Sequence, residues 1–511
     1  MTDLADALPK DVGALQALIL AERAAHAAEA ERLRQIIKEM QRHRFGRRAE
    51  TLPIDQLELG LEDVQQVEAA EHAKAETQDP ERRAASAAKR RSNRGSLPAH
   101  LPRIETLVDI ADKSCPCCSG ALHVIGEDRA ERLDIVPAQL RVLVVRRPKY
   151  ACRTCEDVVV QAPAPARLIE GGLPTEATVA HVVVGKYADH LPLYRQAQIY
   201  ARQGLKLDRS TLADWVGRAA FLLRPVHAHL LQTLKRSPKL FADETTAPVL
   251  DPGRGRTKTG QLWAYARDDR PWSGSDPPAV AYVYAPDRKA ERPMAHLAGF
   301  AGVLQVDGYG GYRALADQGQ VQLAFCWAHV RRRFYELAMA GPAPIATETL
   351  EKIKALYAIE AEIRGLDPEA RRVIRQENTR PLVAALEPWL RGKLETLSQK
   401  TKLAEAIRYA LSRWAGLSRF LDDGRIEIDN NVVERSIRPL ALTRKNSLFA
   451  GSDGGAEHWA ILASLIETAK LNAVDPQAYI TDVITRIVQG HPQSQIDQLM
   501  PWRYAPAADV A

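Results

Sequence analysis

Apolar positions near the amino terminus recur at three- and four-residue intervals. This spacing predicts a helix within residues 1–50 whose alanine-weighted seam favours a short coiled coil; the alternative is a single amphipathic helix packed on the body. A basic cluster surrounds Phe45 at its end. Residues 51–104 are charged and contain no aromatic side chain, which predicts a flexible linker. The repeating positions are Leu15, Leu18, Ala21, Ala25 and Ala28, continued by Leu33, Ile37 and Met40.

Two C-x-x-C pairs mark residues 105–168 and flank two predicted strands, Glu131–Val136 and Leu140–Val145. Knuckles of this spacing, joined by a hairpin, can place four thiolates tetrahedrally around zinc. We therefore predict a zinc ribbon with one structural Zn²⁺, and we assign Cys117 no role because it lacks the knuckle spacing. The alternative is a set of unliganded buried thiols. The four predicted ligands are Cys115, Cys118, Cys152 and Cys155.

Residues 169–236 have helical patterning, with predicted helices at Thr175–Asp189, Tyr194–Arg202 and Thr211–Ala220. The last two are similar to a helix-turn-helix, in which the second helix reads DNA. Ser210 is the predicted cap of that helix, and Ser210 and Thr211 are predicted DNA contacts. The six-residue connection before it is longer than usual, so plain helical packing remains an alternative.

From residue 237 to 475 the pattern changes to three strands, a helix, a strand, a helix and a strand. This order is that of a ribonuclease H-like α/β domain, so the predicted fold class of the whole chain is multidomain α+β. Residues 342–427 show few strand signals and are predicted to be an all-helical insertion, and residues 476–511 a C-terminal tail. The predicted strands are Leu240–Leu250, Gln261–Ala266, Ala279–Tyr284, Val303–Val306 and Val321–Phe325, and the helices are Lys289–Ala298 and Tyr312–Asp317.

The composition fits a multidomain protein with a polyanionic partner. A chain of 511 residues exceeds what one core usually holds. Its net charge of +6 is mild, but basic residues form local clusters that suit a nucleic acid. No apolar run approaches the ~18 residues that cross a membrane, and the amino terminus has no apolar signal core. Paired cysteines indicate metal binding in a reducing compartment, so we expect a cytoplasmic protein.

Three acids are candidate metal ligands. Asp243 lies in the middle of the first predicted strand, Asp307 ends the fourth, and Glu434 follows the insertion. Hard carboxylate oxygens suit two Mg²⁺ (or Mn²⁺) ions, which can serve in-line displacement at a phosphodiester. Other acids, Glu244 included, are interpreted as turn or surface residues.

The segment that carries Glu434 is predicted to be a short helix. Asp429 or Asn430 would cap its start, and Pro439 would end it. Arg438 lies four residues after Glu434 on the same face, so an exposed ion pair between them is the alternative to a metal ligand.

Several residues are expected to support this acidic site. Cys326 and His329 directly follow the fifth strand; two ligands are too few for zinc, so His329 is expected to bond near the acids or simply to pack. With Asn430 and Asn431, they are our predicted active-site support. Basic side chains on the nearby helices and turns are predicted to contact DNA phosphates. They are Arg331, Arg333, Arg435, Arg438, Arg444 and Lys445.

Taken together with the cysteine pairs, these motifs resemble the large transposase of the insertion sequence 66 family. The resemblance spans about residues 10 to 475. It implies a DDE-type transposase in which Asp243, Asp307 and Glu434 bind the catalytic metals, with an amino-terminal helical segment and a zinc-finger-like module serving DNA binding or assembly. The motifs are Phe45-Gly46-Arg47-Arg48-Ala49-Glu50, Phe241-Ala242-Asp243-Glu244-Thr245, Val306-Asp307-Gly308-Tyr309, Cys326-Trp327-Ala328-His329-Val330-Arg331-Arg332, Asp429-Asn430-Asn431, Glu434-Arg435 and Arg444-Lys445-Asn446.

We therefore expect a protein that binds the ends of a mobile element, cuts the DNA and joins the freed ends to target DNA. Two ends must be handled together, so a dimer or larger synapse is expected, and small accessory transposition proteins are possible partners. Two alternatives remain: a DNA-binding regulator without catalysis, and a nuclease of the same fold that cuts without joining.

Overall fold

The computed structural model describes residues 11, 13, 78–93, 140–151, 159–170, 172–251 and 256–505. The chain divides into two compact units, residues 1–139 and 140–511, each considered by itself. The main described element of the first unit is helix α3 (Pro80–Asn93), capped by Asp79, whose carboxylate accepts from two main-chain amides. This stretch of the predicted linker is thus helical. The coiled-coil prediction falls outside the described residues, apart from 11 and 13.

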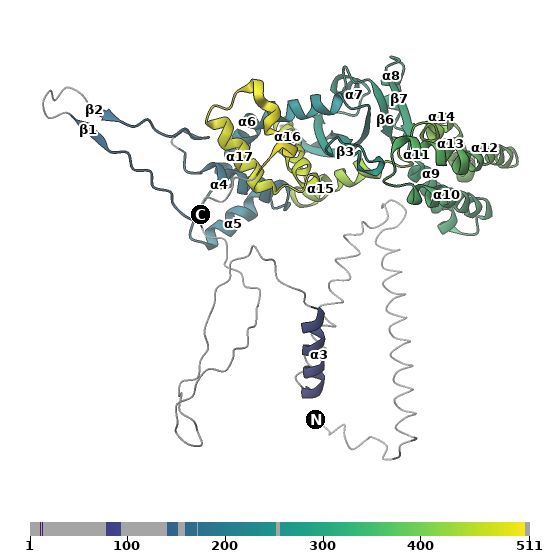
Figure 1. Ribbon diagram of the computed structural model, residues 1–511, viewed down its shortest axis with the longest axis horizontal. Coiled ribbons are helices and arrows are strands. Elements are labelled where there is room, and N and C mark those ends of the chain that lie inside the picture. Colours follow the sequence, from purple (N-terminus) through teal and green to yellow (C-terminus); the bar gives the residue numbers. More distant parts are fainter. Residues whose placement is uncertain are drawn as a thin grey trace. The chain divides into compact units, whose positions relative to one another are not determined.

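A short antiparallel hairpin lies near the start of the second unit (Figure 1). It pairs β1 (Lys149–Ala151) with β2 (Val159–Gln161). The predicted strand Leu140–Val145 is wrong: strand pairing begins only at residue 149, and the apolar side chains of residues 142–145 are exposed. A strand needs a partner, and within the described ranges none pairs with that segment. The other predicted strand, Glu131–Val136, lies outside the described residues.

Three helices follow, α4 (Glu176–Tyr187), α5 (Leu193–Arg202) and α6 (Arg209–Lys235). α6 is far longer than predicted, because its apolar stripe continues to Leu234 and packs against α16 and β5. Asp208 occupies the N-cap position of α6, so the prediction that Ser210 caps this helix is wrong. The predicted second helix of the helix-turn-helix is therefore only the first part of α6, and most of α6 packs in the core.

A five-stranded mixed sheet forms the centre of the second unit, in the order β5–β4–β3–β6–β7. β3 (Lys239–Asp251), β4 (Arg256–Arg267) and β5 (Ala279–Ala285) pair antiparallel. β6 (Gly302–Val306) and β7 (Val321–Phe325) run parallel to β3 and follow crossovers through α7 (Glu291–His296) and α8 (Arg313–Ala316). All five predicted strands are present, β7 with its predicted bounds.

Three carboxy-terminal helices complete the unit, two of them packed on the sheet and the last on other helices. They are α15 (Asn431–Ser447), α16 (Asp453–Leu471) and α17 (Pro476–Val488). α16 lies on β5, where Ser464 Oγ accepts from the amide of Tyr282 at 2.7 Å. α17 packs on α4 and buries Tyr479 and Ile480, and Leu499 and Met500 are also buried. The segment predicted as a tail thus contributes to the core.

The predicted insertion folds into helices that share a second core with β6, β7 and helix α9 (Trp327–Ala340), at the end of the unit opposite α17 (Figure 1). Its buried charges are paired: both Arg371 and Arg375 contact Glu360. Within the described part of the chain, no helix has the length and apolar character needed to cross a bilayer. The helices of the insertion are α10 (Pro344–Glu362), α11 (Pro368–Ile374), α12 (Arg380–Glu395), α13 (Lys402–Leu411) and α14 (Trp414–Ser418), with a π-helical turn at Arg375–Thr379.

Candidate active site

Asp243 lies on β3, and Asp307 directly follows the neighbouring parallel strand β6. β3 and β6 pair Phe241 with Gln305, an offset of 64 residues (305 − 241). The same offset relates Asp243 to Asp307, two residues beyond that last pair. Parallel strands lie ~4.8 Å apart, and residues in register project to the same face of the sheet. The strand order therefore brings the two carboxylates together at the carboxyl end of β6.

β7 extends this row of residues. Val306 pairs with Phe325, so Cys326 follows in register with Asp307. Cys326 Sγ accepts a hydrogen bond from the main-chain amide of Asn430 at 3.2 Å. Residues 426–430, which we name the anchor segment, are thereby attached to the end of β7. The anchor segment leads directly into α15.

Two fully buried amide side chains attach the anchor segment to the strands that carry the aspartates. Gln305 Nε2 on β6 donates to two main-chain carbonyls of the segment, at 2.6 and 2.8 Å. Asn430 Nδ2 donates to the carbonyl of Ala242 on β3 at 3.3 Å. Glu434 lies in the first turn of α15, immediately after these contacts. Its position is therefore set from both β3 and β6.

α15 begins where the sequence predicted, directly after Asp429 and Asn430, but does not end where predicted. Asn430 takes the N-cap position, but its side chain faces the core; the carboxylate of Asp429 instead accepts from the amide of Asn431, at 3.1 Å. Pro439 does not end the helix, which continues to Ser447. Beyond the proline, Leu440 and Thr443 are buried, and α15 packs on β3 and β4, which compensates for the missing amide.

The acidic residues influence one another electrostatically. The pKa of Asp243 is raised well above its ordinary value, first by burial and then by the negative charges of Asp307, Glu244 and Glu434. Main-chain amides fix two of these groups: Asp243 Oδ1 accepts from residue 244 and Asp307 Oδ1 from residue 309, both at 2.8 Å. A cluster of carboxylates held this way is favourable only when positive charge is nearby.

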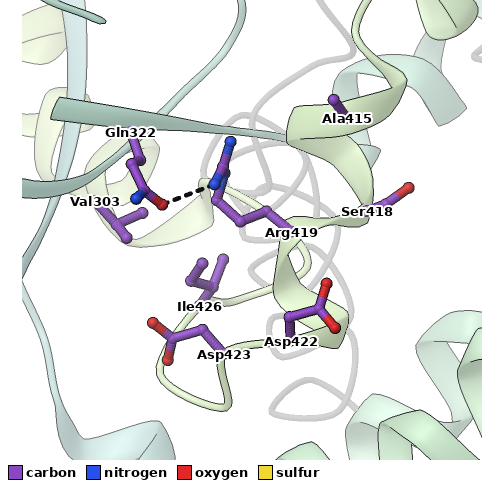
Figure 2. Close-up of a pocket in the computed structure, with 8 residues that line it drawn as sticks. All are labelled: Val303, Gln322, Ala415, Ser418, Arg419, Asp422, Asp423 and Ile426. Atoms are coloured by element: carbon purple, nitrogen blue, oxygen red, sulfur yellow. Dashed lines mark hydrogen bonds between the residues drawn. The ribbon is translucent and has the colours of Figure 1, made fainter. Parts of the chain in front are cut away.

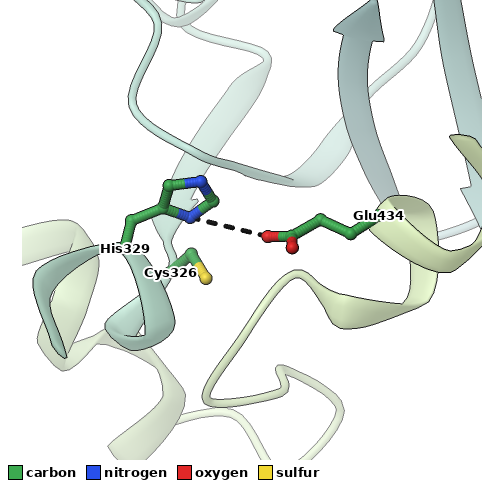
Figure 3. A group of neighbouring side chains, drawn as sticks. All are labelled: Cys326, His329 and Glu434. Carbon is green, nitrogen blue, oxygen red and sulfur yellow. Dashed lines mark ion pairs between the residues drawn. The ribbon is translucent and has the colours of Figure 1, made fainter. Parts of the chain in front are cut away.

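His329 on α9 lies against Glu434, with 3.7 Å between Nδ1 and Oε1 (Figure 3). Both atoms are buried and have no hydrogen-bond partner. Burial lowers the pKa of His329, while Glu434 and Asp307 raise it. His329 therefore lies beside Glu434 without a hydrogen bond to it, and its supporting role stays a prediction. An unpartnered carboxylate oxygen among further carboxylates fits a divalent cation, with Asp243, Asp307 and Glu434 as the hard oxygen ligands.

Cys326, His329 and Glu434 also form a cluster whose ligand atoms lie within 4.8 Å of one another, as Figure 3 shows. Burial raises the pKa of the Cys326 thiol, which favours its protonated form, and its sulfur already accepts the hydrogen bond that holds the anchor segment. Only a thiolate is a strong metal ligand. The contacts of Cys326 thus favour a structural role beside the acids over a zinc ligand.

The interpretation of Glu244 as a turn or surface residue is wrong. Its side chain is 1% exposed, forms an ion pair with Arg288 and accepts a hydrogen bond from Tyr312 at 3.0 Å. Arg288 also lies over the ring of Tyr309. The charge of Glu244 is neutralised within the protein, unlike that of its neighbour Asp243.

Comparison with known proteins gives the family. Residues 171–458, more than half of the chain, match the model described as "Transposase IS66 family". The chain belongs to the IS66 transposase family. Residues 464–502 match the IS66 C-terminal element. Two proteins of Sinorhizobium fredii (strain NBRC 101917 / NGR234), both named as uncharacterized, y4qI and y4jD, are each 46% identical, over 98% and 97% of both chains.

The amino-terminal modules of this IS66 family member are also matched. Residues 112–156 match the zinc-finger binding domain of transposase IS66, which supports a Zn²⁺ site there. Residues 32–106 match a model described as "Transposase C of IS166 homeodomain". The four predicted ligands, Cys115, Cys118, Cys152 and Cys155, lie outside the described residues, so their assignment stays a prediction.

The predicted DNA contacts occupy different environments. Arg331, Arg333, Arg435, Arg438 and Lys445 are exposed, as is Ser210, while Thr211 is partly buried in the first turn of α6. Arg444 instead donates to Thr245 Oγ1 at 3.1 Å and to Thr246 Oγ1 at 2.8 Å, and so holds α15 against β3.

Two hollows lie outside the acidic centre. One, about 330 Å³, lies where β6 and β7 begin, at the end of these strands away from Asp307, and Arg419 in it is bonded to Gln322 (Figure 2). The other, about 210 Å³, is lined by Arg435 together with Asp268 and Glu467. The exposed Arg435 thus borders this second hollow.

Sequence reasoning missed the residues that hold the site together. Gln305 carried a usable signal, because it is a polar residue inside the apolar run of β6, two positions before Asp307. Tyr409 and Arg413, which contact the main chain at Asp307 and Gly308, carried none, since they lie about 100 residues away in the insertion.

Proposed function

We propose that this IS66 family member is a DDE-type transposase with a ribonuclease H-like catalytic domain. The strand order, with three antiparallel strands and two parallel strands added beside the first, supports that fold. The function is supported by the β3–β6 register, which continued by two residues aligns Asp243 with Asp307, and by the buried amides that attach the segment before Glu434 to both strands.

In this proposal Asp243, Asp307 and Glu434 hold two Mg²⁺ or Mn²⁺ ions. Such ions, when bound, lower the pKa of an attacking water or 3′ hydroxyl and stabilise the leaving oxygen. The chain itself supplies rigid placement: buried strands fix the aspartates, and the anchor segment fixes Glu434. Cleavage and strand transfer are both in-line attacks on a phosphodiester, so one site serves both steps.

A strand-transfer assay tests the proposal, using the element's own labelled ends, a target plasmid and Mg²⁺. Wild type should give joined product, and Asp307→Asn should give none. Asp317→Asn is a matched control, because Asp317 is an exposed aspartate on the same crossover. Joining by Asp307→Asn at the rate of Asp317→Asn would refute the assignment of Asp307.

The same assay separates the alternatives. Cutting without joining would favour a ribonuclease H-like nuclease, and binding without chemistry would favour a DNA-binding regulator. The regulator gives no role to the partly buried acidic centre, whose three carboxylates come from β3, from the residue after β6 and from α15.

We also propose that the amino-terminal modules bind DNA, together with Ser210 and Thr211 at the start of α6, and that the protein acts as a dimer or larger synapse. Cys115, Cys118, Cys152 and Cys155 would hold one structural zinc. Metal analysis should find about one zinc per chain, lost in a Cys152→Ser/Cys155→Ser double variant. An unchanged zinc content would exclude this ligand set.

A further inference from the structure

Two arginines and a tyrosine form a compact group beside Asp307. The guanidinium carbons of Arg333 (α9) and Arg413 (just after α13) each lie 3.9 Å from the ring centroid of Tyr409. Tyr409 donates its hydroxyl proton to the main-chain oxygen of Asp307 at 2.7 Å, and Arg413 Nη2 donates to that of Gly308 at 3.2 Å. The group is thus attached to the chain at one of the proposed catalytic residues.

The charges of these two arginines are not neutralised. In the part of the chain that the structure describes, no ion pair joins Arg333 or Arg413 to a carboxylate, and Arg413 Nε is buried without an acceptor. Other arginines of this unit are paired: Arg288 with Glu244, and Arg375 with Glu360. The Tyr409 ring therefore orients two guanidinium groups without cancelling their charge.

Two guanidinium groups held against the same ring repel each other, and an anion bound beside them would offset that repulsion. A planar guanidinium offers parallel N–H donors that match phosphate oxygens, and stacking reduces the freedom that binding would otherwise remove. Since guanidinium groups already lie against the ring, Tyr409 is better suited to holding cations than to stacking on a base. The chemistry of the group is thus that of a phosphate site.

We propose that Arg333, Tyr409 and Arg413 form a phosphate clamp, which holds the DNA backbone next to the phosphodiester cut at Asp307. This role rests on the proposed function, because it assigns the substrate's path across that same site. The insertion supplies Tyr409 and Arg413, so it contributes directly to substrate binding. The clamp fixes the strand by one of its phosphates and is independent of base sequence.

The test uses the full-length protein and a fluorescein-labelled 20-bp duplex of arbitrary sequence, with Ca²⁺ in place of Mg²⁺. Binding is measured by anisotropy over a series of KCl concentrations for wild type, Arg413→Gln and Tyr409→Leu. Arg408→Gln is the matched control: it removes the same charge from α13, but Arg408 bonds to the carbonyl of Gln399, away from the ring. Thermal unfolding of each variant monitors the fold.

Arg413→Gln should weaken binding roughly tenfold and reduce the slope of log K against log[KCl] by about 1, as expected for one lost phosphate contact. Tyr409→Leu should do the same through the loss of stacking. Tyr409→Phe keeps the ring and should keep the slope, although it removes the bond to Asp307. Arg408→Gln should leave the slope unchanged.

A purely structural group would behave differently. If Arg413→Gln lowers the unfolding midpoint but has the slope and affinity of Arg408→Gln, the clamp is wrong while the proposed function stands, provided that wild type still binds and cuts. If wild-type binding is absent or independent of salt, the proposed function fails and the clamp fails with it.

Discussion

Replacing Gln305 by leucine removes the hydrogen bonds that hold the anchor segment while nearly keeping the side-chain volume. Gln305 is fully buried on β6 and donates to two carbonyls of that segment, at 2.6 and 2.8 Å. Its Oε1 also accepts from the amide of Glu427 at 3.3 Å. Gln305→Leu leaves these three main-chain groups without their partner.

The expected loss follows from that count. A buried polar group left without a partner costs about 1–3 kcal/mol, so the variant should lose about 3 kcal/mol, with some groups regaining water. The larger effect should be on catalysis: a displacement of Glu434 by ~1 Å can cost roughly 10²-fold in rate. Activity should therefore fall more than stability.

Three measurements check this reasoning: thermal unfolding, amide hydrogen exchange over residues 426–434, and Mg²⁺-dependent cleavage of DNA. Gln322→Leu is the control, since Gln322 is an exposed glutamine on neighbouring β7 whose side chain accepts from Arg419, and its replacement should cost about 0.5 kcal/mol or less. If Gln305→Leu and Gln322→Leu show equal exchange in the anchor segment, Gln305 does not hold it.

Three further predictions concern charge. Asp243→Asn should raise the unfolding midpoint at neutral pH. The pKa of Asp243 is raised in the folded state, so its carboxyl contributes stability at low pH that is lost as pH rises through that pKa. The stability gained by Asp243→Asn should therefore vanish below about pH 4, and an equal gain at pH 3 and pH 7 would contradict this reasoning. Mg²⁺ at 100 times its Kd should stabilise wild type by about 2.7 kcal/mol and Asp307→Asn far less, and equal midpoint shifts would count against the site. Glu360→Gln should lower the free energy of unfolding, measured by chemical denaturation, by about 3–5 kcal/mol, because Arg375 stays buried without its carboxylate partner. The control Glu387→Gln breaks an exposed pair with Arg391 and should lower it by less than about 1 kcal/mol.

The elements of the central sheet could be predicted from apolar runs, because buried parallel strands are short, almost wholly apolar and bounded by turn residues. β7 was predicted to the residue, and β3 to within one residue at each end. Helix ends were less predictable. Pro225 and Pro439 lie inside α6 and α15, where packing on the sheet and on other helices outweighs the lost hydrogen bond, and a local pattern cannot show that packing.

The sequence could predict individual residues of the candidate site but not the contacts between them. Asp243 and Asp307 follow from their places on strands, and their shared offset could be read from the sequence once β3 and β6 were known to be neighbours. The environment of Glu244 could not, because Arg288 reaches it from 44 positions away. Contacts across such separations depend on the strand order, which short apolar runs do not encode.

The way the acids are held has a consequence for their charge. Burial, and after it the neighbouring carboxylates, raise the pKa of Asp243, so this placement of the acids opposes folding and must be offset by other contacts. Those contacts are uncharged: Gln305 and Asn430 act through amides, and Cys326 through a thiol. The nearby Arg288 is already paired with Glu244, and Arg413 is directed to main-chain oxygens and a ring. In the described part of the chain no arginine or lysine forms an ion pair with Asp243, Asp307 or Glu434, which is the arrangement expected where divalent cations supply the counter-charge.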